Sequence, residues 1–312
     1  MLIIAGFLAP YLVAIAVFPL LAWRPSSSWL ATLMACFLIL CSPWLIPIES
    51  QMLRLLASMT AAMLAIKVID VWTELRRQGL PTWHAHIDFL ANPFTLVRRC
   101  LSQERQPTSR ESLLSLVTGS IGCAAGIALL VVFFKLDWSG WSFLTEHVAK
   151  VIVLMVAITS GLSAAAATWR IAGGTARDFM DMPFAAVTPA DFWRRYNRNV
   201  QQFFWQDVFN ANGGRRAPIQ TMLFVFLLSA MLHELIFFAS IGRVQGYQTA
   251  FFLVQGIAAA STAKIKAKGW CAIPCMASTL AFNLVSSVLF FASIHGVVPF
   301  YSNELPEWLR GW

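Results

Sequence analysis

Apolar residues dominate eight stretches of the chain, and the charged residues gather in the segments between them. A helix needs about 20 apolar residues to cross a hydrocarbon core roughly 30 Å thick, so stretches of this length predict membrane spans. The pattern therefore predicts an all-α, multi-pass transmembrane helical bundle of about eight spans plus interfacial helices, forming a single membrane-embedded domain over residues 1–312. The predicted spans are residues 3–22, 29–48, 52–70, 113–134, 148–169, 219–240, 248–263 and 277–298, of which the seventh is short.

The composition and the placement of charge support a membrane protein and argue against a nucleic-acid partner. Hydrophobic residues make up 58% of the chain and charged residues 12%, whereas a soluble domain has about 45–50% and about 25%. The net charge is +8, but most of the 23 Lys and Arg residues lie in loops that follow odd-numbered predicted spans. The positive-inside rule places these loops, including 71–112 and 170–218, in the cytoplasm and both termini outside. Trp, Phe and Pro in the two long loops predict that they lie along the membrane interface.

The segment 188–209 predicts a helix with a polar and an apolar face. Thr188 is a suitable N-cap, Pro189 suits the first helical position, and Asp191 completes a capping box three residues after the cap. A continuous helix from this cap would put the arginines Arg194, Arg195 and Arg198 on one face and a set of apolar residues on the other. That apolar set is Trp193, Tyr196, Val200, Phe204 and Val208.

Three polar side chains fall where the pattern otherwise has apolar ones. Asn197 interrupts the predicted apolar face, either as a core residue that hydrogen-bonds backbone or as a group that faces a reaction chamber. His233 and Glu234 lie in the middle of a predicted span, where ionisable groups are costly and usually face a cavity or a partner. The alternative for this pair is structural: Ser229, one turn earlier, hydrogen-bonds a buried His233, and Glu234 closes a second hydrogen bond.

The two motifs together are more specific than either alone. The chain reads FWRRYN over residues 192–197 and SAMLHE over residues 229–234. This combination resembles the membrane-bound O-acyltransferase superfamily and is most similar to its branch of wax synthases, sterol acyltransferases and type 1 diacylglycerol acyltransferases. The resemblance is strong over residues 188–238. Tyr196 and Asn199 depart from it, because many relatives have Trp and Pro there, and the short chain favours the wax-synthase-like end of the branch.

The resemblance implies an enzyme that moves an acyl group from acyl-CoA to the hydroxyl of a lipophilic alcohol, giving a wax ester or neutral-lipid ester. It implies His233 as the catalytic base and Asn197 as the residue that orients the thioester or stabilises the developing oxyanion. Acyl-CoA would act as a co-substrate, without a permanently bound cofactor. We expect Asn197 and His233 to approach one cavity. The residues expected to contact substrate are Trp193, Arg194, Arg195, Ser229 and Glu234.

Other functions remain open from the sequence. Within the enzyme class, the alternative is transfer of a short acyl group such as acetyl to a secondary metabolite or polysaccharide. The non-enzyme alternative is a transporter, but that predicts ionisable residues over several spans or broken helices in two matching halves. No metal site is expected, since the HxH pair of His84 and His86 has no further ligand at a suitable spacing. The pattern suits a bacterial inner membrane or the endoplasmic reticulum, with the motif loop facing the cytoplasm, and leaves the acceptor and the oligomeric state open.

Overall fold

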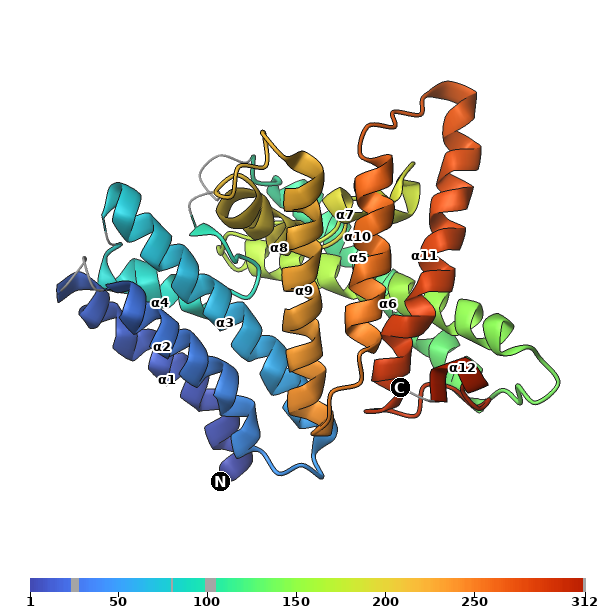
Figure 1. The fold of residues 1–312 in the computed structure, drawn as a ribbon, viewed down its shortest axis with the longest axis horizontal. Helices are drawn as coiled ribbons and strands as arrows, with labels where there is room; N and C mark the ends of the chain where they lie inside the picture. The colour runs from blue at the N-terminus through green and yellow to red at the C-terminus, as the bar shows by residue number, and fades with distance from the viewer. Residues whose placement is uncertain (24–27, 80, 99–104, 311–312) are drawn as a thin grey trace. The chain divides into compact units, whose positions relative to one another are not determined.

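The structure is a computed structural model that describes residues 1–23, 28–79, 81–98 and 105–310. All regular structure in these ranges is helical (Figure 1), which confirms the predicted all-α class. Seven stretches of the described chain are long and apolar enough to cross a membrane. They are α1 (Leu2–Trp23), α2 (Ser28–Cys41) with η1 (Ser42–Leu45), α3 (Gln51–Gln78), α5 (Ser109–Lys135), α6 (Phe143–Ile171), α9 (Pro218–Ile241), and η5 (Gly269–Cys271) with α11 (Ala272–His295).

The eighth predicted span, 248–263, is a helix that falls short of a full crossing. Helix α10 (Tyr247–Thr262) has 16 residues, so its axis is about 24 Å long, compared with a hydrocarbon core of roughly 30 Å. It runs antiparallel to α11, beside which it lies in Figure 1. The prediction of about eight spans therefore corresponds to seven long helices and one short one.

Shorter helices occupy the two long segments predicted to lie at the interface. Residues 80 and 99–104 of the first segment lie outside the described residues. The short helices are α4 (Trp83–Ala91), the 3-10 turn η3 (Pro183–Ala185), α7 (Pro189–Arg195), α8 (Arg198–Phe203), the π-helical turn η4 (Phe204–Phe209) and, near the end of the chain, α12 (Glu307–Arg310).

The chain forms two compact units. The first consists of Met1–Glu104 and Leu232–Val244, and the second of Arg105–Met231 and Gln245–Trp312. Helix α9 contributes residues to both units. The single domain predicted over residues 1–312 stays a prediction.

In the first unit, α1, α2 and α3 pack around a core of apolar side chains that includes Ala14, Ile39 and Leu64. Lys67 is 2% exposed in this unit. Its Nζ atom donates to the carbonyl oxygens of Phe89, Leu90 and Asn92 at 2.6, 3.2 and 2.6 Å. The last carbonyls of a helix lack intrahelical partners, so this buried cation holds the end of α4 against α3.

In the second unit, α5 and α6 approach closely because small residues line their contact. A Cβ atom added to Gly119 would lie 2.7 Å from the carbonyl oxygen of Ser160, and one added to Gly126 would lie 2.8 Å from Cβ of Ala157. Small residues allow helix backbones in a membrane to pack at short range, where dispersion is the main attraction. A larger side chain at either glycine would force these two spans apart.

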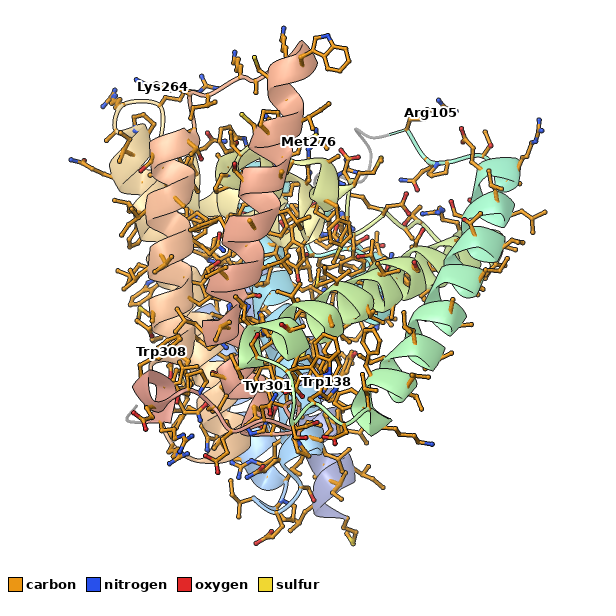
Figure 2. The ribbon with its side chains drawn as sticks, turned by 90° about the vertical axis from the view of Figure 1, so that its right-hand side faces the viewer. Arg105, Trp138, Lys264, Met276, Tyr301 and Trp308 are labelled. Atoms are coloured by element: carbon orange, nitrogen blue, oxygen red, sulfur yellow. The ribbon has the colours of Figure 1, made fainter. Side chains whose placement is uncertain are left out.

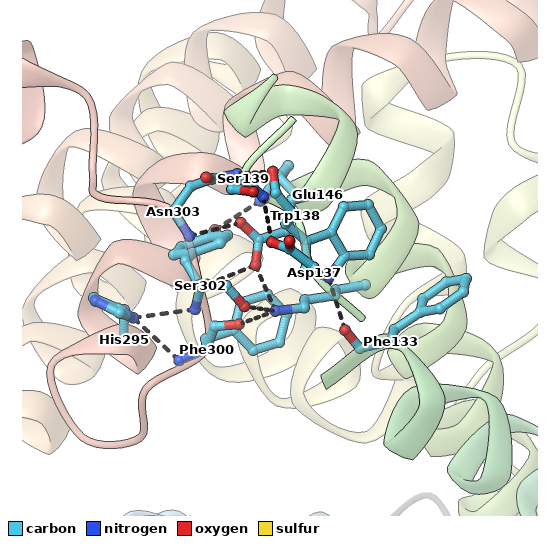
Figure 3. Close-up of polar contacts among 12 residues, drawn as sticks. Phe133, Asp137, Trp138, Ser139, Glu146, His295, Phe300, Ser302 and Asn303 are labelled. Atoms are coloured by element: carbon cyan, nitrogen blue, oxygen red, sulfur yellow. Dashed lines mark hydrogen bonds and ion pairs between the residues drawn. The ribbon is translucent and has the colours of Figure 1, made fainter. Parts of the chain in front are cut away.

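A buried ion pair on α6 holds the segment that follows α11 (Figure 3). Lys150 Nζ lies 2.5 Å from Glu146 Oε1, and both side chains are fully buried. Glu146 also accepts hydrogen bonds from the backbone nitrogens of Ser302 and Asn303, at 2.6 and 3.1 Å. Figure 2 shows Tyr301 of this segment and Met276 of α11 towards opposite ends of that helix. Glu146 therefore lies at the end of the second unit that is opposite to the start of α11.

Candidate active site

Helix α7 begins at the predicted cap, but the predicted capping box is not completed, because the Asp191 carboxylate accepts from the Val187 nitrogen at 3.2 Å instead of the Thr188 nitrogen. Thr188 Oγ1 accepts a hydrogen bond from the backbone nitrogen of Asp191 at 3.0 Å, and Pro189 is the first helical residue. The cap satisfies one of the N–H groups that have no partner at a helix start. The backbone nitrogen of Ala190 donates to Thr262 Oγ1 at 3.4 Å, so α7 starts beside the end of α10.

Asp191 gathers two of the predicted substrate-binding arginines. Its buried carboxylate accepts from Arg195 Nε at 3.0 Å and forms a short ion pair with Arg194. Burial by itself raises the pKa of Asp191, but hydrogen bonds from Arg195, the Val187 nitrogen and Arg194 outweigh it and hold the pKa below its usual value. The Arg194 side chain is 70% exposed. One carboxylate shared by two guanidinium groups leaves this turn of α7 net positive.

The continuous helix predicted over 188–209 is wrong, because the chain breaks at Tyr196 and Asn197. Tyr196 has an extended backbone, and Asn197 has the left-handed conformation, with φ 43° and ψ 63°. That conformation costs most L-residues roughly 1–2 kcal/mol, whereas asparagine adopts it more readily because its side chain can hydrogen-bond locally. Helix α8 starts afresh after the break, so its faces are not a continuation of those of α7.

Backbone hydrogen bonds from an earlier segment fix both sides of the break. The Asp181 nitrogen donates to the Arg195 carbonyl at 2.9 Å, and the Arg198 nitrogen donates to the Phe179 carbonyl at 2.7 Å. These bonds take up one backbone group at the end of α7 and one at the start of α8. The segment that precedes α7 therefore determines where the helix stops.

Asn197 is the N-cap of α8, which corrects its predicted place in the middle of an apolar face. Its Oδ1 atom accepts a hydrogen bond from the Val200 nitrogen at 3.3 Å. The residue is half-buried, and no described residue accepts a hydrogen bond from its Nδ2 atom. The amide oxygen is thus used by the cap, while the two N–H groups of the same amide stay available as donors.

Trp193 anchors α7 in the second unit. Its ring packs edge-on against Phe226 of α9 and lies against Phe251 and Phe252 of α10, with centroid distances of 5.5, 6.3 and 5.7 Å. Its Nε1 atom donates to Gln255 Oε1 at 2.9 Å. Trp193, which was predicted to contact substrate, lies in an aromatic cluster, and its indole N–H donates to Gln255.

Gln255 connects the motif to the last span, and its only signal in the sequence is a polar residue in an apolar stretch. The side chain is 1% exposed. Its Nε2 atom donates to Ser286 Oγ at 2.8 Å and to Asn283 Oδ1 at 3.2 Å. Trp193, Gln255 and Ser286 thus form a hydrogen-bonded connection from α7 through α10 to α11, which suits polar groups buried in a membrane.

His233, Glu234 and Ser229 lie on α9 (Figure 1). Ser229 is buried, and His233 and Glu234 are half-buried. All three take part in interactions with other residues. His233 and Glu234 belong to the first unit, and Ser229 belongs to the second together with Asn197. The shared cavity of Asn197 and His233 stays a prediction.

A family model matches most of the second unit and all of α9. The family model described as MBOAT, membrane-bound O-acyltransferase family, matches residues 128–294, more than half of the chain. A curated relative from Arabidopsis thaliana, named probable long-chain-alcohol O-fatty-acyltransferase 1, is 30% identical over 136 residues. That alignment covers 39% of this chain and 38% of the relative. The family match includes both motifs, and the chain belongs to the membrane-bound O-acyltransferase family.

Proposed function

We propose that this chain transfers an acyl group from acyl-CoA to the hydroxyl of a lipophilic alcohol, giving a wax ester or neutral-lipid ester. The observation that carries the proposal is the Asn197 amide, whose oxygen caps α8 while its N–H groups remain available to a substrate carbonyl. Membership of the O-acyltransferase family supports the reaction class, and the name of the Arabidopsis relative supports a long-chain alcohol as acceptor.

The reaction needs a base and an oxyanion donor. His233 takes the hydroxyl proton of the alcohol, because an alcohol that keeps this proton is a poor nucleophile. The alcohol oxygen then attacks the thioester carbonyl carbon. The C–S bond then breaks, and the proton passes from His233 to the departing thiolate, which regenerates the neutral imidazole. Asn197 Nδ2 donates to the carbonyl oxygen as it gains negative charge. Ser229 and Glu234 orient His233 or the acceptor hydroxyl.

The arginines of α7 suit the charged part of the donor. Arg194 and Arg195 share one carboxylate, that of Asp191, and Arg194 is largely exposed. A guanidinium group binds phosphate oxygens through paired N–H groups. We assign the phosphates of acyl-CoA to this turn of α7, next to Asn197.

The direct test is to supply labelled donors and acceptors to membranes that contain the chain. We expect label from long-chain acyl-CoA to appear in esters when a fatty alcohol, a diacylglycerol or a sterol is added, with the fatty alcohol giving most product. Mass spectrometry of the lipid extract identifies the ester. Label transferred only from acetyl-CoA, or none transferred by normally inserted protein, would contradict the proposal.

The proposed orientation puts the motif in the cytoplasm, at the end of the second unit where α7 meets α10. The exposed Cys271 lies at this end, directly before α11. Ser139 follows Trp138 in the loop between α5 and α6, and Figure 2 shows Trp138 near the opposite end. In a variant with Cys271 as sole cysteine, we expect an impermeant maleimide to label the chain after the cells are permeabilised and not before. A sole cysteine at Ser139→Cys should be labelled in intact cells. The reverse result would place the motif outside.

Gln255→Leu is expected to lower turnover about tenfold, because it leaves the Trp193 N–H without an acceptor at a buried site, a loss typically worth about 1–3 kcal/mol. The matched control is Gln248→Leu, on the same helix. Gln248 is equally buried and donates to the Phe290 carbonyl at 3.2 Å. Both variants should lose some thermal stability in detergent, but only Gln255→Leu should lose kcat. Equal kcat values for the two variants would remove the positioning role of Gln255.

A further inference from the structure

The loop between α10 and α11, residues 263–268, carries positive charge without a nearby negative one. We call it the basic loop, and its charged residues are Lys264, Lys266 and Lys268. All three side chains are exposed. The sequence has no Asp or Glu between Glu234 and Glu304, and no ion pair within the described chain involves these lysines. The basic loop therefore offers three unpaired ammonium groups to a partner outside the described chain.

Exposed apolar side chains alternate with and follow these lysines. Ile265 is 52% exposed, Trp270 is 88% exposed and Ile273 is 60% exposed. Burial of such groups away from water is favourable, and tryptophan is enriched where a membrane meets water, because its ring is apolar and its N–H is polar. A lysine there lays its hydrocarbon stem along the apolar layer and keeps its ammonium group among the headgroups. The mixture of side chains in this segment thus suits a lipid surface better than open water.

The length of the last span places this segment at the depth of the headgroups. Gly269–His295 has 27 residues, so it is about 40 Å long, compared with a hydrocarbon core of roughly 30 Å. Figure 1 shows α11 running past the end of α10, with the connecting loop at that end. Figure 2 shows Lys264 at the same end of the second unit. The start of the span and the basic loop therefore extend beyond the hydrocarbon core.

We propose that the basic loop binds anionic lipid headgroups, with its lysines on the lipid phosphates and Trp270 and Ile273 among the first carbons of the acyl chains. Clustered lysines are attracted to anionic lipid by their charge. An acidic protein would attract the lysines too, but the exposed Trp270 and Ile273 continue the exposed apolar surface of α11, which favours lipid. The loop follows Thr262, whose Oγ1 atom accepts the hydrogen bond of the Ala190 nitrogen. A lipid held by the loop therefore lies beside the start of α7.

A fluorescent label on Cys271 tests this proposal without any need for turnover. The full chain with Cys271 as sole cysteine carries an NBD group and is placed in nanodiscs of phosphatidylcholine, with or without phosphatidylglycerol. We expect phosphatidylglycerol to shift the NBD emission to the blue, since the loop then lies on the lipid, and a headgroup-level nitroxide lipid to quench it. High salt should reverse both changes in the unmodified loop, because it screens exposed charges.

Lysine variants measure the contribution of charge. Each of Lys264→Gln, Lys266→Gln and Lys268→Gln should raise the phosphatidylglycerol fraction that gives half of the shift about fivefold, and the triple variant should show no shift. Lys135→Gln is the matched control, because Lys135 is an exposed lysine of the same unit at the end of α5, and its half-shift fraction should not change.

Three results would overturn the proposal. The first is the same emission in both kinds of nanodisc, and the second is an undiminished shift in the triple variant. The third is an equal shift when inorganic phosphate is added to phosphatidylcholine nanodiscs, which would indicate a site for free phosphate and not for a lipid. A shift seen in crude membranes but never with purified protein in nanodiscs would likewise exclude lipid and point to an acidic protein partner.

Discussion

Replacing His233 by alanine is expected to abolish ester formation while the protein still inserts and folds. A general base typically contributes about 10²–10⁴ in rate, and the alcohol has no other means of losing its proton in an apolar site. Stability should change little, since the substitution removes a polar group from a span, where such groups are costly. Ester product and membrane-inserted protein are measured together in the same preparation.

The control for this variant is Met231→Ala, two residues earlier on α9, whose side chain is 62% exposed and has no role in the proposed reaction. We expect it to retain much of the activity, and Glu234→Gln to fall between the two variants. If normally inserted His233→Ala protein makes near wild-type amounts of ester, His233 is not the base. That result would also remove most of the support for the reaction as proposed.

Asn197→Asp is expected to lower kcat by about 10²–10³, the usual effect of losing one oxyanion donor, with a small change in KM. Aspartate keeps an oxygen for the Val200 nitrogen and, like asparagine, tolerates the left-handed backbone, so α8 should stay capped. The substitution removes the N–H groups, which no described residue uses, and adds a carboxylate charge that also disfavours a developing oxyanion. Steady-state kinetics and a thermal unfolding midpoint in detergent check both expectations.

Asn197→Ala separates the two roles of this side chain. It loses the cap as well as the donor, so it should lose activity like Asn197→Asp and also about 1 kcal/mol of stability. Full activity in a stable Asn197→Asp protein would show that asparagine is kept here for the cap alone. Loss of stability in both variants, with normal kcat per folded molecule, would lead to the same conclusion.

The sequence by itself determined the helices and the family. Each predicted span contains a helix, because only a chain that pairs its own backbone groups can lie in lipid, and about 20 apolar residues suffice to indicate one. The start of α7 was also predictable, since the cap involves Thr188 and the residues directly after it. The FWRRYN and SAMLHE motifs identified the O-acyltransferase family, which the family match confirms.

The tertiary structure alone decided which polar residues are already paired. His147 lies in a span and is fully buried, with Nε2 facing the Leu284 carbonyl at 2.9 Å and Nδ1 facing the Tyr301 hydroxyl at 2.7 Å. These partners are more than 130 residues away in sequence. No local pattern around His147 could have indicated these partners.

The break at Asn197 could not be predicted from the sequence, because it also depends on partners that are distant in the chain. Residues 188–209 have a helical pattern, and local propensity favours one helix. Helix α7 instead stops at Arg195, because the Asp181 nitrogen donates to the Arg195 carbonyl before the break and the Phe179 carbonyl accepts from the Arg198 nitrogen after it. Periodicity reports which faces are apolar, whereas these bonds depend on a segment folded back from earlier in the chain. The orientation of the Asn197 amide follows from that long-range pairing.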